Sequence, residues 1–447
     1  MFIQNINIIY FIYGLSTGIF VLMKTETREM NAATTGVRQG SREFRTITLA
    51  FFVAGFATFI TLYDVQPLLP VFCAEYGVPA ALASLPLSVA TSALAATMLL
   101  AGTVSETWGR KPVMVLSLCV TSLLALVTPL SHTFGALLAL RLIQGGVLAG
   151  LPAVAMAYLS EEMDAASLAA AMGLYIAGNA VGGMTGRIFT AAITDLFSWR
   201  VAIGTIGVIC LGMSLVFARS LPPSANFRRR PFQASYLLTS LLKHLRDPGL
   251  LSLYGIAFLL TGSFVTLYNY ITFRLLGAPY NFSHTVVSSL FLVYLIGSWS
   301  SASIGRVTRR FGRENVLLAA MAVMGGGAAI TLAHQVSAIV CGMALFTAGF
   351  FAAHAIASSW VGTRAQTAKA QASSLYLFSY YLGSSISGTL GGIFWTTFGW
   401  DGVVSMIVFL VAGALVVAVR LVRLFGDTAA APEEFGELEE IPAQPSN

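Results

Sequence analysis

The chain has 447 residues, of which 56% are hydrophobic and only 10% are charged. A soluble domain carries about a quarter charged residues, so this composition excludes a soluble fold and predicts a lipid bilayer around the apolar surface. The net charge of +6 reflects the retention of positive residues on one side of a membrane, and it gives no reason to expect nucleic acid as a partner.

Residues 1–45 contain an apolar stretch, 2–23, followed by a basic tail. The stretch lacks a basic front and a small-residue cleavage site, which argues against a signal peptide. It predicts either a thirteenth membrane helix or upstream sequence translated from a mistaken start. The polar tail that opens at Met30 favours the second interpretation.

Twelve apolar segments, each long enough to span a bilayer, follow one another along the body of the chain. Most Lys and Arg residues fall in the loops on one side of these segments, which predicts that both ends of the twelve-span body are cytoplasmic. The segments lie near residues 46–71, 81–103, 112–131, 134–158, 167–194, 199–219, 249–275, 284–304, 315–333, 335–358, 371–396 and 401–424.

Asp64 is the only acidic residue placed well inside a predicted span, just before Pro67, which is expected to kink the helix. A carboxyl group in a poorly hydrated cavity can take up and release a proton, so Asp64 is a candidate proton carrier. The alternative is a carboxylate in a wet outer vestibule that titrates normally.

The loop after the second span reads Gly102-Thr-Val-Ser-Glu106-Thr-Trp-Gly109-Arg110-Lys111. Gly109 permits a tight turn, Gly102 permits close approach of a neighbouring helix, and Glu106 can face a helix N-terminus or pair with Arg110. Such a latch would hold the cytoplasmic side shut. The pattern recurs in the second half as Gly305–Glu314, with Arg309 in the place of Glu106.

This spacing, G-x-x-x-[DE]-x-x-G-R-K, resembles the signature of the major facilitator superfamily, although members usually carry a basic residue where Thr107 stands. The resemblance implies an all-α membrane protein of twelve helices in two parallel six-helix repeats, with the possible extra N-terminal helix. The predicted organisation is a first half at 46–219, a cytoplasmic linker at 220–247 with a short helix near Leu237–Leu245, a second half at 248–424, and an acidic, disordered tail at 425–447.

Span 4 contains Leu137-x3-Arg141-x2-Gln144-Gly145, which resembles a second motif of the family that is implicated in proton coupling. An arginine inside a bilayer must face a cavity, a carboxylate or backbone carbonyls. We therefore expect Arg141 to act in proton coupling, or else to be a structural residue bound to carbonyls. Ala344 stands at the equivalent place in the second half.

Span 5 contains Gly178-Asn179-x2-Gly182-Gly183, which resembles the antiporter motif G-P-x-x-G-G of drug-exporting members, with Asn179 in place of proline. Together with neighbouring sequence it is similar to the YnfM-type efflux permeases, whose substrates are poorly defined. The glycine face should pack closely on a neighbouring helix.

Arg187 lies further along span 5. As a functional residue it would bind an anionic or polyhydroxyl substrate. The alternative is that it reaches the membrane interface and pairs with Asp195. Candidates for a substrate cavity are polar or aromatic residues of both halves, although most such residues serve packing. They are Asn179, Arg187, Tyr268, Asn269 and His354, with Tyr270, Trp299, Tyr380 and Tyr381 as lesser candidates.

The favoured function is proton-coupled efflux of a small organic solute by antiport, in a bacterial-type inner membrane and by a monomer. Import with protons, or uniport, of a sugar or metabolite is the alternative. The halves differ at their charged positions, which argues against a passive channel. The sequence contains no paired catalytic residues, no metal-ligand spacing and no nucleotide loop, so we expect neither an enzyme nor a cofactor.

Overall fold

A computed structural model of the chain describes residues 36–227 and 234–425. Within these residues the backbone is helical apart from its loops and an isolated bridge between Val37 and Met163. The N-terminal apolar stretch, the run Arg228–Arg230 and the acidic tail of the sequence predictions lie outside the described residues.

Ten helices in this part of the chain are long and apolar enough to cross a membrane. The longest, α17 (Lys369–Phe425), contains two predicted spans, because the positive φ of Gly399 (φ 61°, ψ −147°) interrupts it. Counting α17 as two and adding the 18-residue helix α15 (Arg313–Ile330) accounts for all twelve predicted spans. The prediction of an all-helical, twelve-span fold is confirmed.

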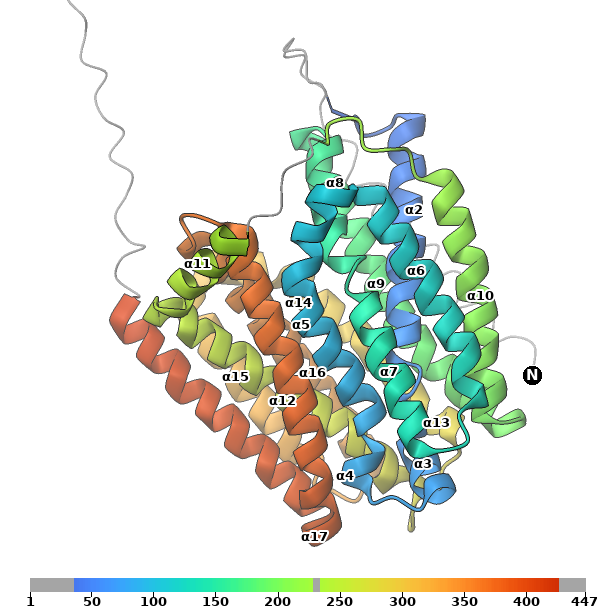
Figure 1. The fold of residues 1–447 in the computed structure, drawn as a ribbon. Coiled ribbons are helices and arrows are strands. Elements are labelled where there is room, and N and C mark those ends of the chain that lie inside the picture. The colour runs from blue at the N-terminus through green and yellow to red at the C-terminus, as the bar shows by residue number, and fades with distance from the viewer. Residues whose placement is uncertain (1–35, 228–233, 426–447) are drawn as a thin grey trace, which may run out of the picture. The chain divides into compact units, whose positions relative to one another are not determined.

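The first six spans run from α2 to α10, and two of them are broken by proline (Figure 1). Pro67 ends the first span's long helix early, and Pro152 separates α7 from α8. The elements are α2 (Arg42–Tyr63), η1 (Gln66–Leu68), α3 (Leu69–Tyr76), α4 (Ala80–Ala83), α5 (Leu85–Trp108), α6 (Arg110–Val127), η2 (Thr128–Leu130), α7 (Phe134–Leu148), α8 (Pro152–Glu162), α9 (Ala165–Leu196) and α10 (Trp199–Ser220).

The last six spans follow a short helix, α11 (Ala234–Leu245), which is the helix predicted within the linker. The helix α2 ends at Tyr63, the last residue of Thr61-Leu-Tyr63, whereas the equivalent helix α12 continues past the matching Thr266-Leu-Tyr268. The elements are α12 (Pro248–Leu276), α13 (His284–Ser289), η3 (Leu290–Val293), α14 (Tyr294–Phe311), α15, α16 (Val336–Arg364) and α17.

Short polar side chains mark where several of these helices begin. Each accepts a hydrogen bond from a backbone N–H of the first turn, which would otherwise lack a partner in the helix. Asp164 caps α9 through Ser167 N at 2.7 Å, and Asp247 caps α12 through Leu250 N at 2.8 Å.

Glycine allows α2 and α9 to pack backbone against backbone. A Cβ atom placed on Gly178, Gly182 or Gly186 would run into the main chain of α2, at Phe52, Phe56 and Ile60 respectively. These glycines recur every four residues, so they lie on one helix face. The equivalent pair in the second half, α12 and α17, has the same close approach at Gly383, which faces the backbone of Phe258.

The two sets of six helices meet near one end of the bundle. We call this end, which holds Asp195 and the loop before α13, the opposite end, and the end that holds Gly109 and Gly312 the basic end. As far as the described residues show, hydrogen bonds between the two sets lie toward the opposite end. They join Gln66 to Asn269, Ser84 and Ser88 to Thr389, Thr91 to Ser385, and Asp195 to His284 and Thr285.

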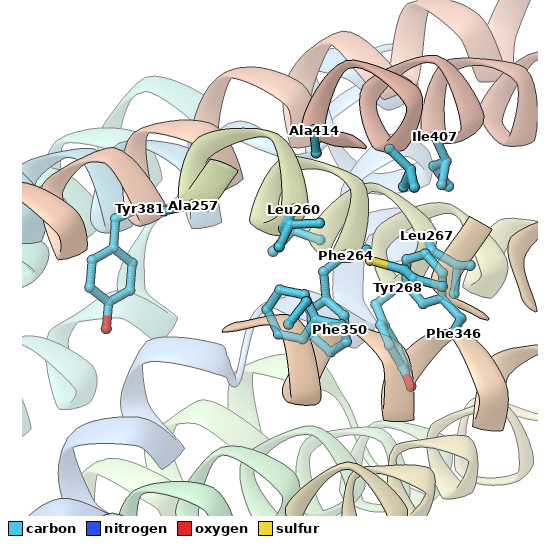
Figure 2. Close-up of a cluster of buried hydrophobic side chains, with 14 of the residues drawn as sticks. Ala257, Leu260, Phe264, Leu267, Tyr268, Phe346, Phe350, Tyr381, Ile407 and Ala414 are labelled. Carbon is cyan, nitrogen blue, oxygen red and sulfur yellow. The ribbon is translucent and has the colours of Figure 1, made fainter. Parts of the chain in front are cut away.

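Aromatic rings fill the core of the second half between α12 and α16 (Figure 2). The ring of Phe264 stacks on that of Phe350 with centroids 3.9 Å apart, and Tyr268 and Phe346 lie within 6 Å of the same ring. Offset aromatic packing of this kind stabilises a core beyond the area it buries. The cluster also extends to rings that reach Arg187 of the first half, described below.

Candidate transport site

Asp64 and Arg141 form an ion pair in the interior of the first half. Nη1 of Arg141 lies 3.1 Å from Oδ1 of Asp64, and the exposed fractions of the two residues are 1% and 0%. The wet vestibule considered for Asp64 is therefore wrong. Oδ2 of Asp64 has no hydrogen-bond partner among the described residues.

Arg141 also binds the broken end of α2. Because Pro67 has no N–H and the helix stops at Tyr63, carbonyls in its last turn lack helical donors. Arg141 donates to the carbonyls of Thr61 at 3.1 Å and Leu62 at 2.8 Å, and more weakly to that of Pro86 at 3.4 Å. Both predicted environments of Arg141, carboxylate and carbonyl, thus exist together.

Gln144, one helical turn beyond Arg141, completes this network. Its Oε1 accepts from Nη1 of Arg141 at 2.7 Å, and its Nε2 donates to the carbonyl of Thr121 at 3.2 Å. The predicted motif of span 4 therefore holds the guanidinium from its own helix and anchors it to α6.

Arg187 is buried as well, with 3% of its surface exposed. Its Nε donates to Oε1 of Gln66 at 2.5 Å, and its Nη1 donates to the carbonyl of Gly183 at 2.6 Å. The alternative pairing with Asp195 is wrong, because the carboxylate of Asp195 instead accepts from the backbone N–H groups of His284 and Thr285.

Three aromatic rings surround the Arg187 guanidinium. Its central carbon lies 3.9 Å from the ring centroid of Tyr63, 4.8 Å from that of Phe291 and 5.1 Å from that of Tyr294. Tyr63 belongs to the first half and the other two belong to the second. A guanidinium over a ring face is attracted by the ring's quadrupole, so Arg187 lies where the halves meet.

Gln66 connects Arg187 to the second half. While its Oε1 accepts from Arg187, its Nε2 donates to Oδ1 of Asn269 at 2.8 Å. The segment from Tyr63 to Gln66 therefore contacts both buried arginines, because Asp64 within it pairs with Arg141. Sequence reasoning assigned no role to Gln66; the available signal was an amide inside an apolar span, two residues from Asp64.

The other predicted cavity residues of the second half differ in their contacts and in their exposure. The hydroxyl of Tyr268 is 2.7 Å from that of Thr347, and Nδ1 of His354 is 2.9 Å from the Tyr376 hydroxyl. His354 is thus hydrogen-bonded within the helix bundle. Trp299 is 72% exposed and lies on the outer surface of the protein.

Asn179 and the glycines of span 5 lie at the interface of α9 with α2. Gly178 and Gly182 make the close contacts described above, while a Cβ on Gly183 would lie 3.2 Å from Nη1 of Arg187. Asn179 faces Gly55 of α2, and its Oδ1 lacks a hydrogen-bond partner within the described part of the chain. The site residues of this motif thus border the Arg187 region.

At the basic end, Arg110 pairs with Glu161 of α8 rather than with Glu106. The contact is bidentate, at 2.7 and 3.2 Å, and Nη1 of Arg110 donates to the hydroxyl of Ser105 at 2.6 Å. Glu106 is half-buried and makes no hydrogen bond or ion pair with any described residue. Glu161 was not predicted, because nothing in its local sequence distinguishes it from another charged helix end.

The remaining residues of this loop shape the turn between α5 and α6. Gly109 has a φ of 102°, as the predicted tight turn requires. Lys111 donates to the carbonyl of Leu221 at 2.6 Å. A Cβ on Gly102 would lie 4.0 Å from the carbonyl of Ala153, so the approach there is ordinary contact.

The described residues contain no group of three or more acidic, His or Cys side chains that could hold a metal ion. The site is instead two buried guanidinium groups: Arg141, paired with a carboxylate inside the first half, and Arg187, bound to neutral groups where the two six-helix repeats meet. This arrangement inside a helical membrane bundle defines a membrane transporter rather than an enzyme.

Comparison with known proteins agrees. Residues 47–298 match the Major Facilitator Superfamily, and the chain belongs to this family. It is 49% identical to the uncharacterized MFS-type transporter YybF of Bacillus subtilis (strain 168) over 87% of this chain and 96% of that protein. It is 46% identical to the inner membrane transport protein YnfM of Escherichia coli (strain K12), over 89% and 96%.

Solved structures share the fold at low identity. A bacterial homolog of the human lysosomal transporter Spinster, in an inward-facing and occupied conformation, superposes with a TM-score of 0.69 at 15% identity, covering 88% of this chain and all of that one. The nucleoside transporter NupG gives the same TM-score at 14% identity, covering 85% and 100%.

Proposed function

We propose that this transporter couples the movement of a small organic solute to protons, and that Asp64 carries the proton. The observation behind this is the fully buried Asp64–Arg141 pair, in which one carboxylate oxygen has no partner. A buried charge is normally compensated by a charge of opposite sign. Proton uptake by Asp64 would loosen its hold on Arg141, which would remain bound to the end of α2.

The basic end is proposed to be cytoplasmic, in the inner membrane, because it carries the loops rich in Lys and Arg. The conformation described here would then face inward, since the hydrogen bonds between the halves gather toward the opposite end. Glu106 without a partner fits this state, because the latch of Glu106 should form only when the cytoplasmic side closes.

Alternating access would follow from rocking of residues 46–219 against 248–424 about the linker 220–247, within a monomer. Each state would bind proton and substrate with different affinity, and that difference is what couples their movements. The interface between Gln66 and Asn269 lies where the two halves would separate.

Two directions of coupling are consistent with this site. Efflux by antiport is the one indicated by the span 5 motif, and it requires that substrate and proton oppose each other's binding. Import together with protons is the second candidate, and Arg187 favours it: a buried cation without a carboxylate partner would bind an anion more tightly when Asp64 is protonated.

A solute screen in reconstituted vesicles, with and without a pH gradient, tests the proposal. Asp64→Asn and Arg141→Ala should abolish pH-driven transport of any solute that the native protein moves. Asp401→Asn, an exposed acid near Gly399, is the matched control and should transport normally. Full pH-driven transport by both core variants would refute the assignment of Asp64 and Arg141, while leaving the family membership intact.

A further inference from the structure

Arg187 differs from three other buried or half-buried arginines, Arg110, Arg141 and Arg200, in the charge of its partners. Arg110, Arg141 and Arg200 each contact a carboxylate, at Glu161, Asp64 and Glu75 respectively. Arg187 is at least as deeply buried as two of these. Among the described residues its partners are neutral: an amide oxygen, a backbone carbonyl, the Tyr63 side chain and further aromatic rings. A buried cation is normally compensated by an anion, and here the protein supplies none.

One hydrogen-bond donor beside Gln66 has no acceptor within the described structure. It is Nδ2 of Asn269, which is fully buried. Arg187, on the other side of Gln66, donates through Nε and Nη1 to neutral oxygens. The amide orientations are determined, because arginine can only donate, which assigns the oxygen of Gln66 and in turn that of Asn269. The missing partner must therefore supply acceptors.

Aromatic rings and a glycine surround these groups. The rings of Tyr63, Phe291 and Tyr294 lie around the guanidinium and offer apolar faces. On the other side, Gly388 comes close to Asn269, since a Cβ there would lie 3.2 Å from Nδ2. Carboxylates bind arginine with short, charge-assisted hydrogen bonds.

We infer that the transported solute is a small organic carboxylate, and that Arg187 and Asn269 bind its anionic group while Gln66 positions both. This inference rests on the proposed transport function and names its substrate class. Binding would replace the missing charge partner of Arg187 and the missing acceptor of Asn269. Because Gln66 bridges the halves, the anion would bind at the contact that must open during transport.

The position of the site along α9 is consistent with entry from the basic end. Asp195 lies eight residues beyond Arg187 on this helix, at the opposite end, where its hydrogen bonds join α9 to α13. A solute at Arg187 would thus lie directly inside the closed end.

Equilibrium binding to the purified full-length protein tests this inference. The probes are matched carboxylate, amide and amine forms of the same skeleton: benzoate, benzamide and benzylamine, and butyrate, butyramide and butylamine. We expect binding of one or both carboxylates and not of their neutral or cationic counterparts. Arg187→Gln should weaken that binding by about tenfold or more, and Arg187→Lys, which keeps the charge, by less.

Arg274→Gln is the matched control, because Arg274 donates to backbone carbonyls of the second half and should not affect carboxylate binding. A purely structural Arg187 would change thermal stability without discriminating among the three forms. The inference is overturned if no carboxylate of the set binds, if amides or amines bind equally well, or if Arg187→Gln binds like the native protein. Asp64→Asn separates the two proposals: it should keep carboxylate binding even where it loses pH-driven transport.

Discussion

The Arg141 side chain binds three groups, and each of them would lose a hydrogen-bond partner if this side chain were removed. Its guanidinium contacts the Asp64 carboxylate, the carbonyls at the end of α2 and the amide of Gln144. Removing the Arg141 side chain would leave the Asp64 carboxylate buried without a charge partner and the other groups without their donor, which costs about 3–5 kcal/mol. The equivalent position in the second half is Ala344, whose side chain cannot form such an ion pair.

Arg141→Ala should therefore lower the stability of the protein by about 3–5 kcal/mol, whereas Asp64→Asn should cost about 1–2 kcal/mol. The asparagine can still accept from Arg141, and the carbonyls of Thr61 and Leu62 keep their donor. Thermal unfolding of the purified variants in one detergent gives the comparison. Equal destabilisation by both substitutions would show that the contacts of Arg141 with α2 contribute little.

Helix packing explains how much of this architecture could be predicted from the sequence. The breaks at Pro67 and Gly399, the turn at Gly109 and the glycine face of α9 depend on local chemistry that short motifs reveal. The contact of Asp64 with Arg141 joins residues 77 positions apart, so the two were recognisable as unusual charges but not as a pair.

The sequence did not reveal Gln66, Glu161 or the bridging role of Asp195, and the physical reason is the same for all three. Their functions come from partners that the fold brings from other helices, at Arg187, Arg110 and Thr285. Periodicity indicates which face of a helix is apolar, but it does not identify the residue opposite a polar side chain. The sequence therefore leaves both a buried and an exposed Arg187 open, and the structure shows that it is buried.

The α2–α9 interface gives a prediction at the scale of elements. Gly182→Ala should destabilise the protein by about 1–3 kcal/mol, because its Cβ would overlap the main chain of Phe56, which cannot move aside without shifting α2. Gly173→Ala on the same helix is the matched control. Nothing lies within 4 Å of its Cβ position, so the change should be neutral or stabilise the helix by about 0.5–1 kcal/mol.

Thermal unfolding of the two alanine variants measures this difference. Similar melting temperatures would mean that α2 and α9 can separate without loss, and the close approach would then not hold the helices together.

At the scale of the whole molecule, Asp195 links the two halves at the opposite end. Its carboxylate accepts from the N–H of Thr285 at 2.8 Å, from that residue's hydroxyl at 2.6 Å and from the N–H of His284 at 3.2 Å. These donors lie at the start of α13, where a carboxylate is favoured by the helix dipole. Because the contact joins the two halves, opening of this end would break it.

Asp195→Ala should shift the population toward the state that is open at this end. Distances between spin labels placed on the two halves at the opposite end should lengthen relative to the native protein. Asp401→Ala, an exposed acid near that end, should leave them unchanged. Unaltered distances in Asp195→Ala would mean that the bonds between Thr389 and α5 suffice to close this end.

The net charge of the buried groups determines whether proton and solute favour or oppose each other's binding. With Asp64 ionised, the two buried arginines leave a net charge of +1, and proton uptake raises it to +2. Arg141 is the charged group paired with Asp64 in the described structure. At a separation on the order of 10 Å and an effective dielectric constant of about 20, a proton on Asp64 strengthens anion binding by about 1.7 kcal/mol.

By linkage, the anion strengthens proton binding by the same amount, so the two should move in the same direction. Vesicles equilibrated with a labelled carboxylate on both sides, then given an acid exterior, should accumulate it inside. This result does not depend on the orientation of the protein in the vesicle, because coupling is a property of the cycle. Net loss of the label would instead establish antiport, and it would mean that proton and solute exclude each other at Asp64 despite the charge of Arg187.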